Sequence, residues 1–170
     1  MSGRRIIDDF RYVHFITFGV DKKRRLLEME MPREILLEVF NHQLDSFSAK
    51  CLGFVVMPDH VHLLVCFSET GQLSRFMHGL KRMSSFRIRK WFKEKCINYF
   101  QEVDLGDRFW LPKYYSFEIE TQEKLEEKLE YIHMNPVRSE LVSKAVDWEW
   151  SSARWYYLGE DVSVPLEWVD

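Results

Sequence analysis

The chain has 170 residues, of which 46% are hydrophobic and 30% charged, and its formal net charge is −3 at pH 7. This composition suits one compact domain over residues 1–170 and excludes a disordered or fibrous protein. Three cysteines without a Cys-x-x-Cys pair argue against a disulfide framework. No stretch approaches the roughly 20 apolar residues that span a bilayer, so we expect no membrane partner and a cytoplasmic location.

The first half of the chain predicts a strand, a helix and two further strands. Tyr12–Val20 is rich in aromatic and β-branched residues, which is typical of a strand. After Pro32, apolar residues recur every three or four positions, as in a helix with proline in its first turn. Lys50–Met57 and His60–Phe67 are apolar runs joined at Pro58, which predicts a tight antiparallel hairpin.

The third quarter of the chain predicts a long helix, a loop and a fourth strand. The helix follows the Ser68–Gly71 loop, keeps one apolar face and is expected to be interrupted near Ser84. Gln101–Lys113 contains glycine and proline and is expected to be a loop. In Tyr114–Glu120, large apolar side chains alternate with polar ones, which is typical of a half-buried strand.

The last predicted helix is followed by an aromatic extension. Gln122–Met134 is rich in helix-forming residues, and Thr121 is a candidate N-cap. Pro136 is expected to end or kink this helix at Asn135. The remaining segment, 137–170, contains four tryptophans, so we expect it to pack on the core or on a ligand rather than to form a free tail.

The element order strand, helix, strand, strand, helix, strand is that of a ferredoxin-like sandwich. We therefore predict an α+β fold with a mostly antiparallel sheet backed by helices. The core should cover about residues 10–136, with a C-terminal helix that carries Tyr131.

A basic row follows one face of the long helix. Lys81–Lys95 contains seven basic residues and one glutamate, a net charge of +6. At 100° per residue, four cations and one aromatic ring share a stripe of this helix. A charge run alone usually marks a solvated face, but the interleaved ring favours a nucleic-acid groove. The stripe consists of Arg75, Arg82, Phe86, Arg89 and Lys93.

Two pairs of residues could form a reactive site. His60 and His62 are two apart in a predicted strand, so both rings project from one face and could chelate a divalent ion. Two half-buried histidines with hydrogen-bond partners would show the same pattern. Tyr131 and Asn135 are four apart and share one helix face. The Asn135 carbonyl could complete an open metal site, and Tyr131 is a candidate nucleophile if it is not an ordinary helix tyrosine.

Four stretches of the chain resemble the REP-associated tyrosine transposases, relatives of the single-tyrosine insertion-sequence transposases within the HUH endonuclease group. The resemblance runs from the predicted first strand to the C-terminal extension. Its specificity comes from a His-x-His triplet followed about 70 residues later by Tyr-x-x-x-Asn-Pro and then by Trp-x-Trp-Ser-Ser. The matching stretches are Val56–Leu64, Arg108–Trp110, Tyr131–Arg138 and Asp147–Ser152.

The resemblance implies a function and a role for each site residue. His60 and His62 would bind a divalent ion, Mg²⁺ or Mn²⁺, and Asn135 would complete the site. Tyr131 would attack a phosphodiester of single-stranded hairpin DNA and leave a 5′-phosphotyrosine and a free 3′-OH. The protein would act as a monomer or homodimer, associated with the nucleoid when bound to DNA.

One position departs from the pattern. The insertion-sequence relatives carry glutamine, which is one methylene longer, where this chain has Asn135. His133 is a candidate substitute ligand, but it lies two residues from Tyr131 and therefore points to nearly the opposite side of a regular helix.

Three other functions fit parts of the sequence. The first is a DNA-hairpin-binding regulator that does not cleave. The second is a conjugative relaxase or replication initiator with the same chemistry, which usually has further domains. The third is a metal-dependent hydrolase that uses water while Tyr131 is structural; a covalent protein–DNA adduct would distinguish the transposase from it.

Overall fold

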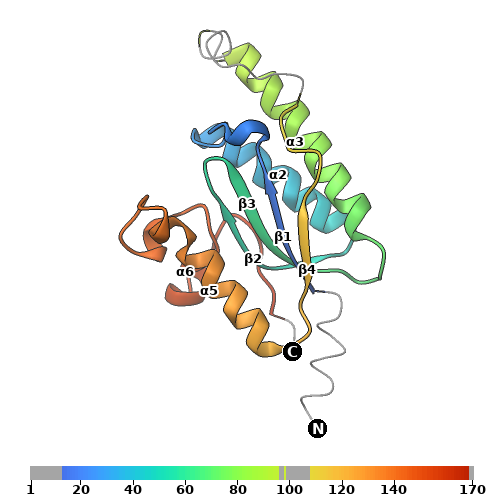
Figure 1. Ribbon diagram of the computed structural model, residues 1–170, viewed down its shortest axis with the longest axis vertical. Coiled ribbons are helices and arrows are strands. Elements are labelled where there is room, and N and C mark those ends of the chain that lie inside the picture. Colours follow the sequence, from blue (N-terminus) through green and yellow to red (C-terminus); the bar gives the residue numbers. More distant parts are fainter. Residues whose placement is uncertain (1–12, 96–97, 99–107, 169–170) are drawn as a thin grey trace.

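Four antiparallel strands form one sheet in the order β2-β3-β1-β4 (Figure 1). The computed structural model describes residues 13–95, 98 and 108–168. The strands are β1 (Val13–Gly19), β2 (Lys50–Val56), β3 (His60–Cys66) and β4 (Tyr115–Glu118). The predicted α+β, ferredoxin-like sandwich is confirmed. Tyr12, the predicted start of the first strand, and most of the predicted loop Gln101–Lys113 lie outside the described residues.

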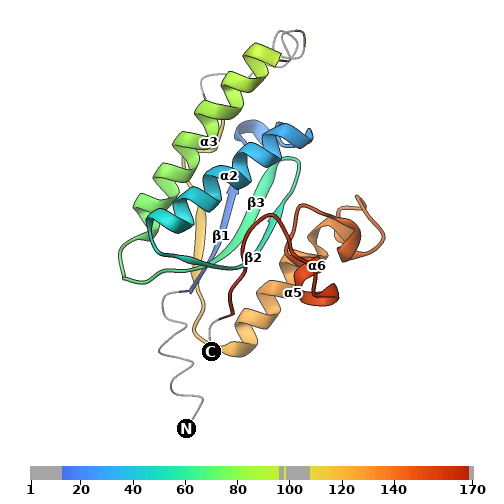
Figure 2. The same ribbon diagram turned by 180° about the vertical axis from the view of Figure 1, so that it is seen from behind.

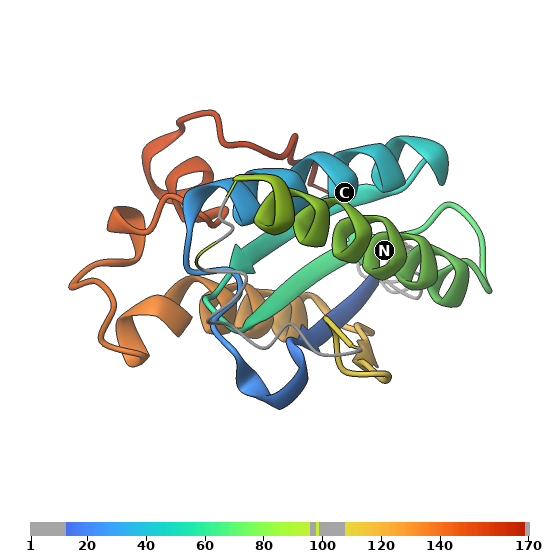
Figure 3. The same cartoon turned by 90° about the horizontal axis from the view of Figure 1, so that it is seen from above.

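Three long helices cover both faces of the sheet, two on one side and one on the other (Figures 2 and 3). The elements are η1 (Asp21–Lys23), α2 (Glu30–Ser46), α3 (Leu73–Lys95), α5 (Gln122–Arg138), η2 (Ala145–Asp147) and α6 (Ala153–Leu158). Because strand side chains alternate, Ile16 and Phe18 pack toward α2 and α3, whereas Phe15 packs toward α5. Within the described ranges no helix is long and apolar enough to cross a membrane.

Helix α3 is continuous, so the predicted interruption near Ser84 is wrong. The Ser84 hydroxyl is buried and donates to the Leu80 carbonyl at 2.6 Å. It also accepts the indole N–H of Trp110 at 3.0 Å. The serine is therefore satisfied inside the packed helix and does not compete with its backbone hydrogen bonds.

Helix α5 begins where the sequence predicts but ends later. Thr121 caps it, since its hydroxyl oxygen accepts the backbone N–H of Lys124 at 3.1 Å. The predicted end at Asn135 is wrong, because the helix continues through Pro136 to Arg138. A proline this close to the end removes only one intrahelical donor, and the Pro136 ring is buried. Asn135 therefore keeps helical geometry on the same face as Tyr131.

A glycine in β2 makes room for a side chain of α5. A Cβ atom added at Gly53 would lie 2.6 Å from Cδ2 of Leu129, which is closer than real Cβ contacts. Leu129 is buried on the sheet-facing side of α5 together with Leu125 and Ile132. The missing side chain at Gly53 thus leaves space for Leu129 of the helix that carries Tyr131.

The C-terminal extension covers the outer edge of β2. Backbone N–H groups of Val56 and Ser152 donate to the carbonyls of Trp150 and Phe54 at 2.8 and 3.0 Å. The Trp148 indole adds a hydrogen bond to the Val56 carbonyl at 3.1 Å. The extension therefore packs on the core, which was one of the two predicted alternatives. It also forms hydrogen bonds with backbone groups that an open sheet edge would expose.

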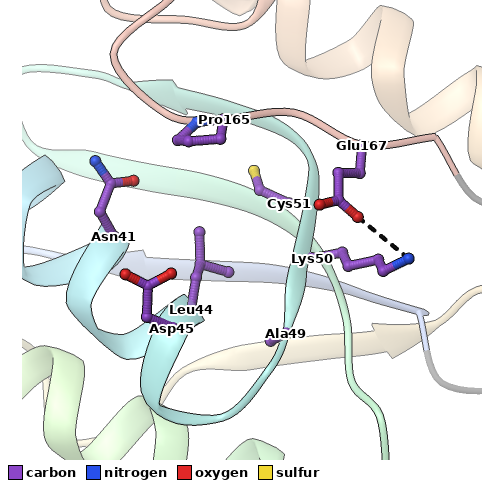
Figure 4. A pocket seen from close by; sticks show the side chains of 8 residues that line it. All are labelled: Asn41, Leu44, Asp45, Ala49, Lys50, Cys51, Pro165 and Glu167. Carbon is purple, nitrogen blue, oxygen red and sulfur yellow. Dashed lines mark ion pairs between the residues drawn. The ribbon is translucent and has the colours of Figure 1, made fainter.

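A small pocket of about 180 Å³ lies between the end of the extension and α2 (Figure 4). Lys50 and Glu167 form an ion pair of 3.1 Å at its rim. Cys51 lines it, and burial raises the pKa of this thiol far above its usual range. Cys51 is thus an unreactive core residue. Cys51 and Cys66 are both in the thiol form, whereas Cys96 lies outside the described residues.

Candidate active site

The histidine pair lies on the sheet face that α5 covers. His60 and His62 project from the same side of β3, and their ring centroids are 4.8 Å apart. Nδ1 of His60 is 2.6 Å from the Asp59 carboxylate, and Nδ1 of His62 is 2.8 Å from the Thr17 hydroxyl on β1. Oxygen partners at Nδ1 favour a proton there, which leaves the lone pair on Nε2 of each ring.

Helix α5 brings a carboxamide to the same place. Nδ2 of Asn135 lies 3.0 Å from Nε2 of His62, and both side chains are buried. Asn135 therefore reaches the histidine although it is shorter than glutamine. Rotation of the carboxamide exchanges its nitrogen and its oxygen, so the same side chain can present an oxygen ligand to a cation.

Electrostatics keep His62 neutral. Burial, with smaller contributions from the charges of His60, Arg138 and Lys128, lowers its pKa to about 3. An imidazole binds a metal ion through an unprotonated nitrogen. His62 is thus in the form that can act as a ligand across the physiological pH range.

Tyr131 stands beside this cluster with an exposed ring. Its centroid is 5.3 Å from that of His62, and 42% of the residue is exposed to solvent. Two cations flank the ring: the Arg138 guanidinium carbon lies 4.5 Å from the centroid and the Lys128 ammonium 5.6 Å from it. Arg138 also donates to the Tyr131 carbonyl at 2.6 Å. The phenol is therefore accessible and lies in a positively charged environment.

Sequence reasoning missed two partners of the site, Arg138 and Thr17. Arg138 is seven residues after Tyr131, so helical spacing alone could have identified it. Thr17 carries no such signal, because it meets His62 only through the pairing of β1 with β3.

The donor set suits an open metal site rather than a closed one. Two imidazoles and one carboxamide come together, and in the described part of the chain no group of three or more His, Cys, Asp or Glu side chains could hold a metal ion. Structural zinc sites use four protein ligands, whereas an open site leaves positions for substrate or water. His60, His62 and Asn135 are therefore the residues that could hold a divalent ion beside Tyr131.

His133 is not part of this cluster. It points away from Tyr131, is almost fully buried, and its Nε2 lies 2.8 Å from the Ser152 hydroxyl. The rings of Tyr156 and Tyr157 pack against it. Burial lowers its pKa to about 4. His133 therefore connects α5 to the C-terminal extension and does not replace Asn135.

The structure brings together three of the five residues of the predicted basic stripe. Arg82, Phe86 and Arg89 line an open groove of about 450 Å³ between α3 and residues 108–112. Phe86 is 69% exposed. Arg75 lies at the other end of α3, over the Phe47 ring at 5.6 Å, and neither Arg75 nor Lys93 lines the groove. Lys81 and Arg108 complete the basic lining.

The basic groove and the histidine cluster lie on opposite sides of the sheet but meet through one segment. The Lys81 ammonium donates to the Leu111 carbonyl at 2.6 Å on the groove side. The Leu111 N–H in turn donates to the Gly19 carbonyl at 2.9 Å, and Gly19 is paired with His60. Leu111 therefore links the lining of the groove to the strand pair that carries His60.

A family sequence model described as transposase, IS200-like, matches residues 10–135. This range includes both histidines, Tyr131 and Asn135. The chain belongs to the IS200-like transposase family. No curated protein sequence matches it significantly.

Two solved structures share the fold of this IS200-like transposase. A REP-associated tyrosine transposase bound to a REP hairpin has a TM-score of 0.69 at 18% identity, covering 94% of this chain and 86% of its own. A candidate transposase from Deinococcus radiodurans R1 has a TM-score of 0.52 at 18% identity, covering 71% of this chain and 87% of its own. At this level of identity the likeness establishes the fold alone.

Proposed function

We propose that this IS200-like transposase cleaves and rejoins single-stranded DNA at a hairpin, with Tyr131 as nucleophile and a divalent ion, Mg²⁺ or Mn²⁺, at His60, His62 and Asn135. The observation that carries the proposal is the meeting of α5 with β3. Asn135 lies 3.0 Å from His62, and the exposed Tyr131 ring stands one helical turn away, 5.3 Å from the same imidazole.

Each group has a definite part in the reaction. The phenol of Tyr131 gives up its proton and its oxygen bonds to phosphorus, the bond from phosphorus to O3′ breaks, and the departing 3′ oxygen takes up a proton, so there is no net change in protons. The products are a 5′-phosphotyrosine and a free 3′-OH, and attack by a 3′-OH on the phosphotyrosine rejoins the strand. The positive charges of Arg138 and Lys128 stabilise the negative charge that develops on the phosphate. The bound ion would polarise the phosphodiester.

The basic groove would supply the DNA contacts outside the catalytic centre. Arg82 and Arg89 can neutralise phosphates, and the exposed Phe86 ring between them can stack on a base or sugar. A relative with the same fold is bound to a REP hairpin, which supports hairpin DNA as the substrate.

Trapping the covalent intermediate tests this function. The protein is incubated with an end-labelled DNA hairpin that has single-stranded flanks, with and without Mg²⁺, and adducts are separated under denaturing conditions. We expect a Mg²⁺-dependent adduct that mass spectrometry maps to Tyr131, and no adduct with Tyr131→Phe, which removes only the hydroxyl. Cleavage without an adduct would identify a hydrolase, and binding without cleavage a regulator. An adduct at Tyr156 or Tyr157 would contradict the geometry.

A further inference from the structure

Strand β4 exposes two aromatic rings that its sequence pattern predicts to be half-buried. Tyr115 is 56% exposed and Phe117 36%, whereas Ile119, the next residue of the alternation, is fully buried. Strand pairing places Tyr115 beside Thr17 and Phe117 beside Phe15, on the sheet face of the histidine cluster. Helix α5 packs mainly on β2 and β3, and the two β4 rings stay exposed. Exposed rings gathered in one place indicate a binding surface.

The side of α5 next to these rings is basic, although the helix is rich in glutamate. At 100° per residue, three cations share an arc of about 80° with Tyr131 and Asn135. These cations are Lys124, Lys128 and Arg138. The one glutamate close to this arc, Glu127, forms an ion pair of 3.0 Å with Lys124. The remaining glutamates of the helix, Glu123, Glu126 and Glu130, turn away from the rings.

Lys128 joins the exposed rings to the candidate nucleophile. Its ammonium group lies 5.7 Å from the Phe117 centroid, 4.8 Å from that of Phe15 and 5.6 Å from that of Tyr131. In a single nucleic-acid strand, flat bases alternate with phosphates. Solvent-exposed rings with cations between them can stack on those bases and bind those phosphates. An apolar protein partner would leave the Lys128 charge without an acceptor.

We propose that Tyr115 and Phe117 form a stacking platform for the unpaired nucleotides next to the phosphate that Tyr131 attacks, with Lys128 bound to the phosphate between them. The inference rests on the proposed function, because it takes the substrate to be single-stranded DNA. The platform gives the single strand its own site on the histidine face, separate from the hairpin contacts of the basic groove.

The test compares two DNA ligands that differ only in their unpaired flanks. Both carry a dye in the hairpin loop, and one has single-stranded flanks that contain 2-aminopurine, whose fluorescence reports stacking. Dissociation constants are measured for the parent protein and for Tyr115→Ser, Phe117→Ser and the double variant. Tyr115→Phe and Phe117→Tyr keep the rings, and Tyr157→Ser removes a ring on α6 that is as exposed as that of Tyr115.

We expect the flanks to tighten binding by the parent protein and each serine variant to lose roughly 10-fold of flanked-hairpin affinity. Affinity for the blunt hairpin should stay within about twofold of that of the parent protein. The ring-keeping variants and Tyr157→Ser should bind like the parent protein. Equal losses for both ligands, or an unchanged contribution from the flanks, would overturn the platform. A protein dimer that the serine substitutions dissociate, with flank binding intact, would assign the surface to a second copy of the chain instead.

This binding experiment and the adduct-trapping assay together distinguish the two proposals. If the flank contribution depends on Tyr115 and Phe117 but no adduct forms at Tyr131, the platform stands and the cleavage function fails. If Tyr131 forms the adduct and the serine variants bind the flanks normally, the cleavage function stands and the platform fails.

Discussion

The carboxamide nitrogen of Asn135 lies 3.0 Å from Nε2 of His62, although 73 positions separate the two residues in the chain. This contact joins the helix that carries Tyr131 to the strand that carries the histidines. Both side chains are buried and hydrogen-bonded, so the phenol is held at a defined distance from the proposed metal site.

Removing a proposed ligand should abolish cleavage and spare hairpin binding. We expect His62→Ala and Asn135→Ala to lower the rate of adduct formation by on the order of 100-fold or more, because a bound Lewis acid supplies several kcal/mol. Calorimetric titration with Mn²⁺ should show the matching loss of metal binding, whereas Asn135→Gln should retain it. His42→Ala, at an exposed position of α2, is the control. Undiminished cleavage by a His60→Ala, His62→Ala double variant would remove the metal site from the mechanism.

The hydroxyl of Thr17 should orient His62 for metal binding. Thr17→Val keeps the shape of the side chain but removes the partner of His62 Nδ1. Partners of this kind typically contribute 10- to 100-fold in metal affinity or activity, and we expect a loss roughly in that range. Mn²⁺ titration measures it, and an unchanged melting temperature would show that the loss is local. A variant with parental metal affinity would mean that the hydroxyl has no orienting role.

Arg138 should accelerate the chemical step. Its guanidinium lies over the Tyr131 ring and would face the phosphate at that ring. Arg138→Gln should slow adduct formation by roughly 100-fold, as the loss of other charge-stabilising groups does, and Arg138→Lys should recover part of the rate. Single-turnover kinetics at saturating DNA separate this effect from binding. Arg25→Gln, which removes a cation from an exposed ion pair with Glu28, is the control. Equal rates of adduct formation in the Arg25 and Arg138 variants would exclude a role of Arg138 in the chemical step.

The basic groove should determine the salt dependence of binding. Arg82→Glu and Arg89→Glu together should weaken binding to all DNA sequences and reduce the log–log salt slope by about one to two units, because each phosphate contact releases counterions. Lys90→Glu, outside the groove on α3, has the same change in charge per site and should have a smaller effect. An unaltered slope in the double variant would place the DNA elsewhere.

Acid should destabilise the fold through His133. The pKa of this histidine is about 4 in the folded protein and about 6.5 when unfolded. The unfolded chain therefore binds one more proton between these values, so the free energy of unfolding decreases as the pH falls from about 6.5 to about 4. His133 alone should account for ~3 kcal/mol. Urea titrations across this range measure the slope, and His133→Gln should be less sensitive to acid than the parent protein. An equal slope in both would assign the acid sensitivity to other groups, such as His62.

Local periodicity was enough to predict the four strands and the three long helices, and to place each pair of candidate site residues on one face. His60 and His62 share a strand face because their side chains repeat every second residue, and Tyr131 and Asn135 share a helix face because they are four apart. The same kind of pattern predicted the cap at Thr121. These relations depend only on neighbours along the chain, so no tertiary contact is needed to infer them.

Only the tertiary structure decided which of these faces meet. The pairing of β1 with β3 brings Thr17 to His62, and the packing of α5 over Gly53 brings Asn135 to the same imidazole. Tertiary packing also leaves the Tyr115 and Phe117 rings open and directs His133 away from the site. Such contacts join positions tens of residues apart, so the repeat pattern within one strand or helix does not predict them. Strand order and the packing of α5 on the sheet therefore determine that these separately predicted segments come together in one site.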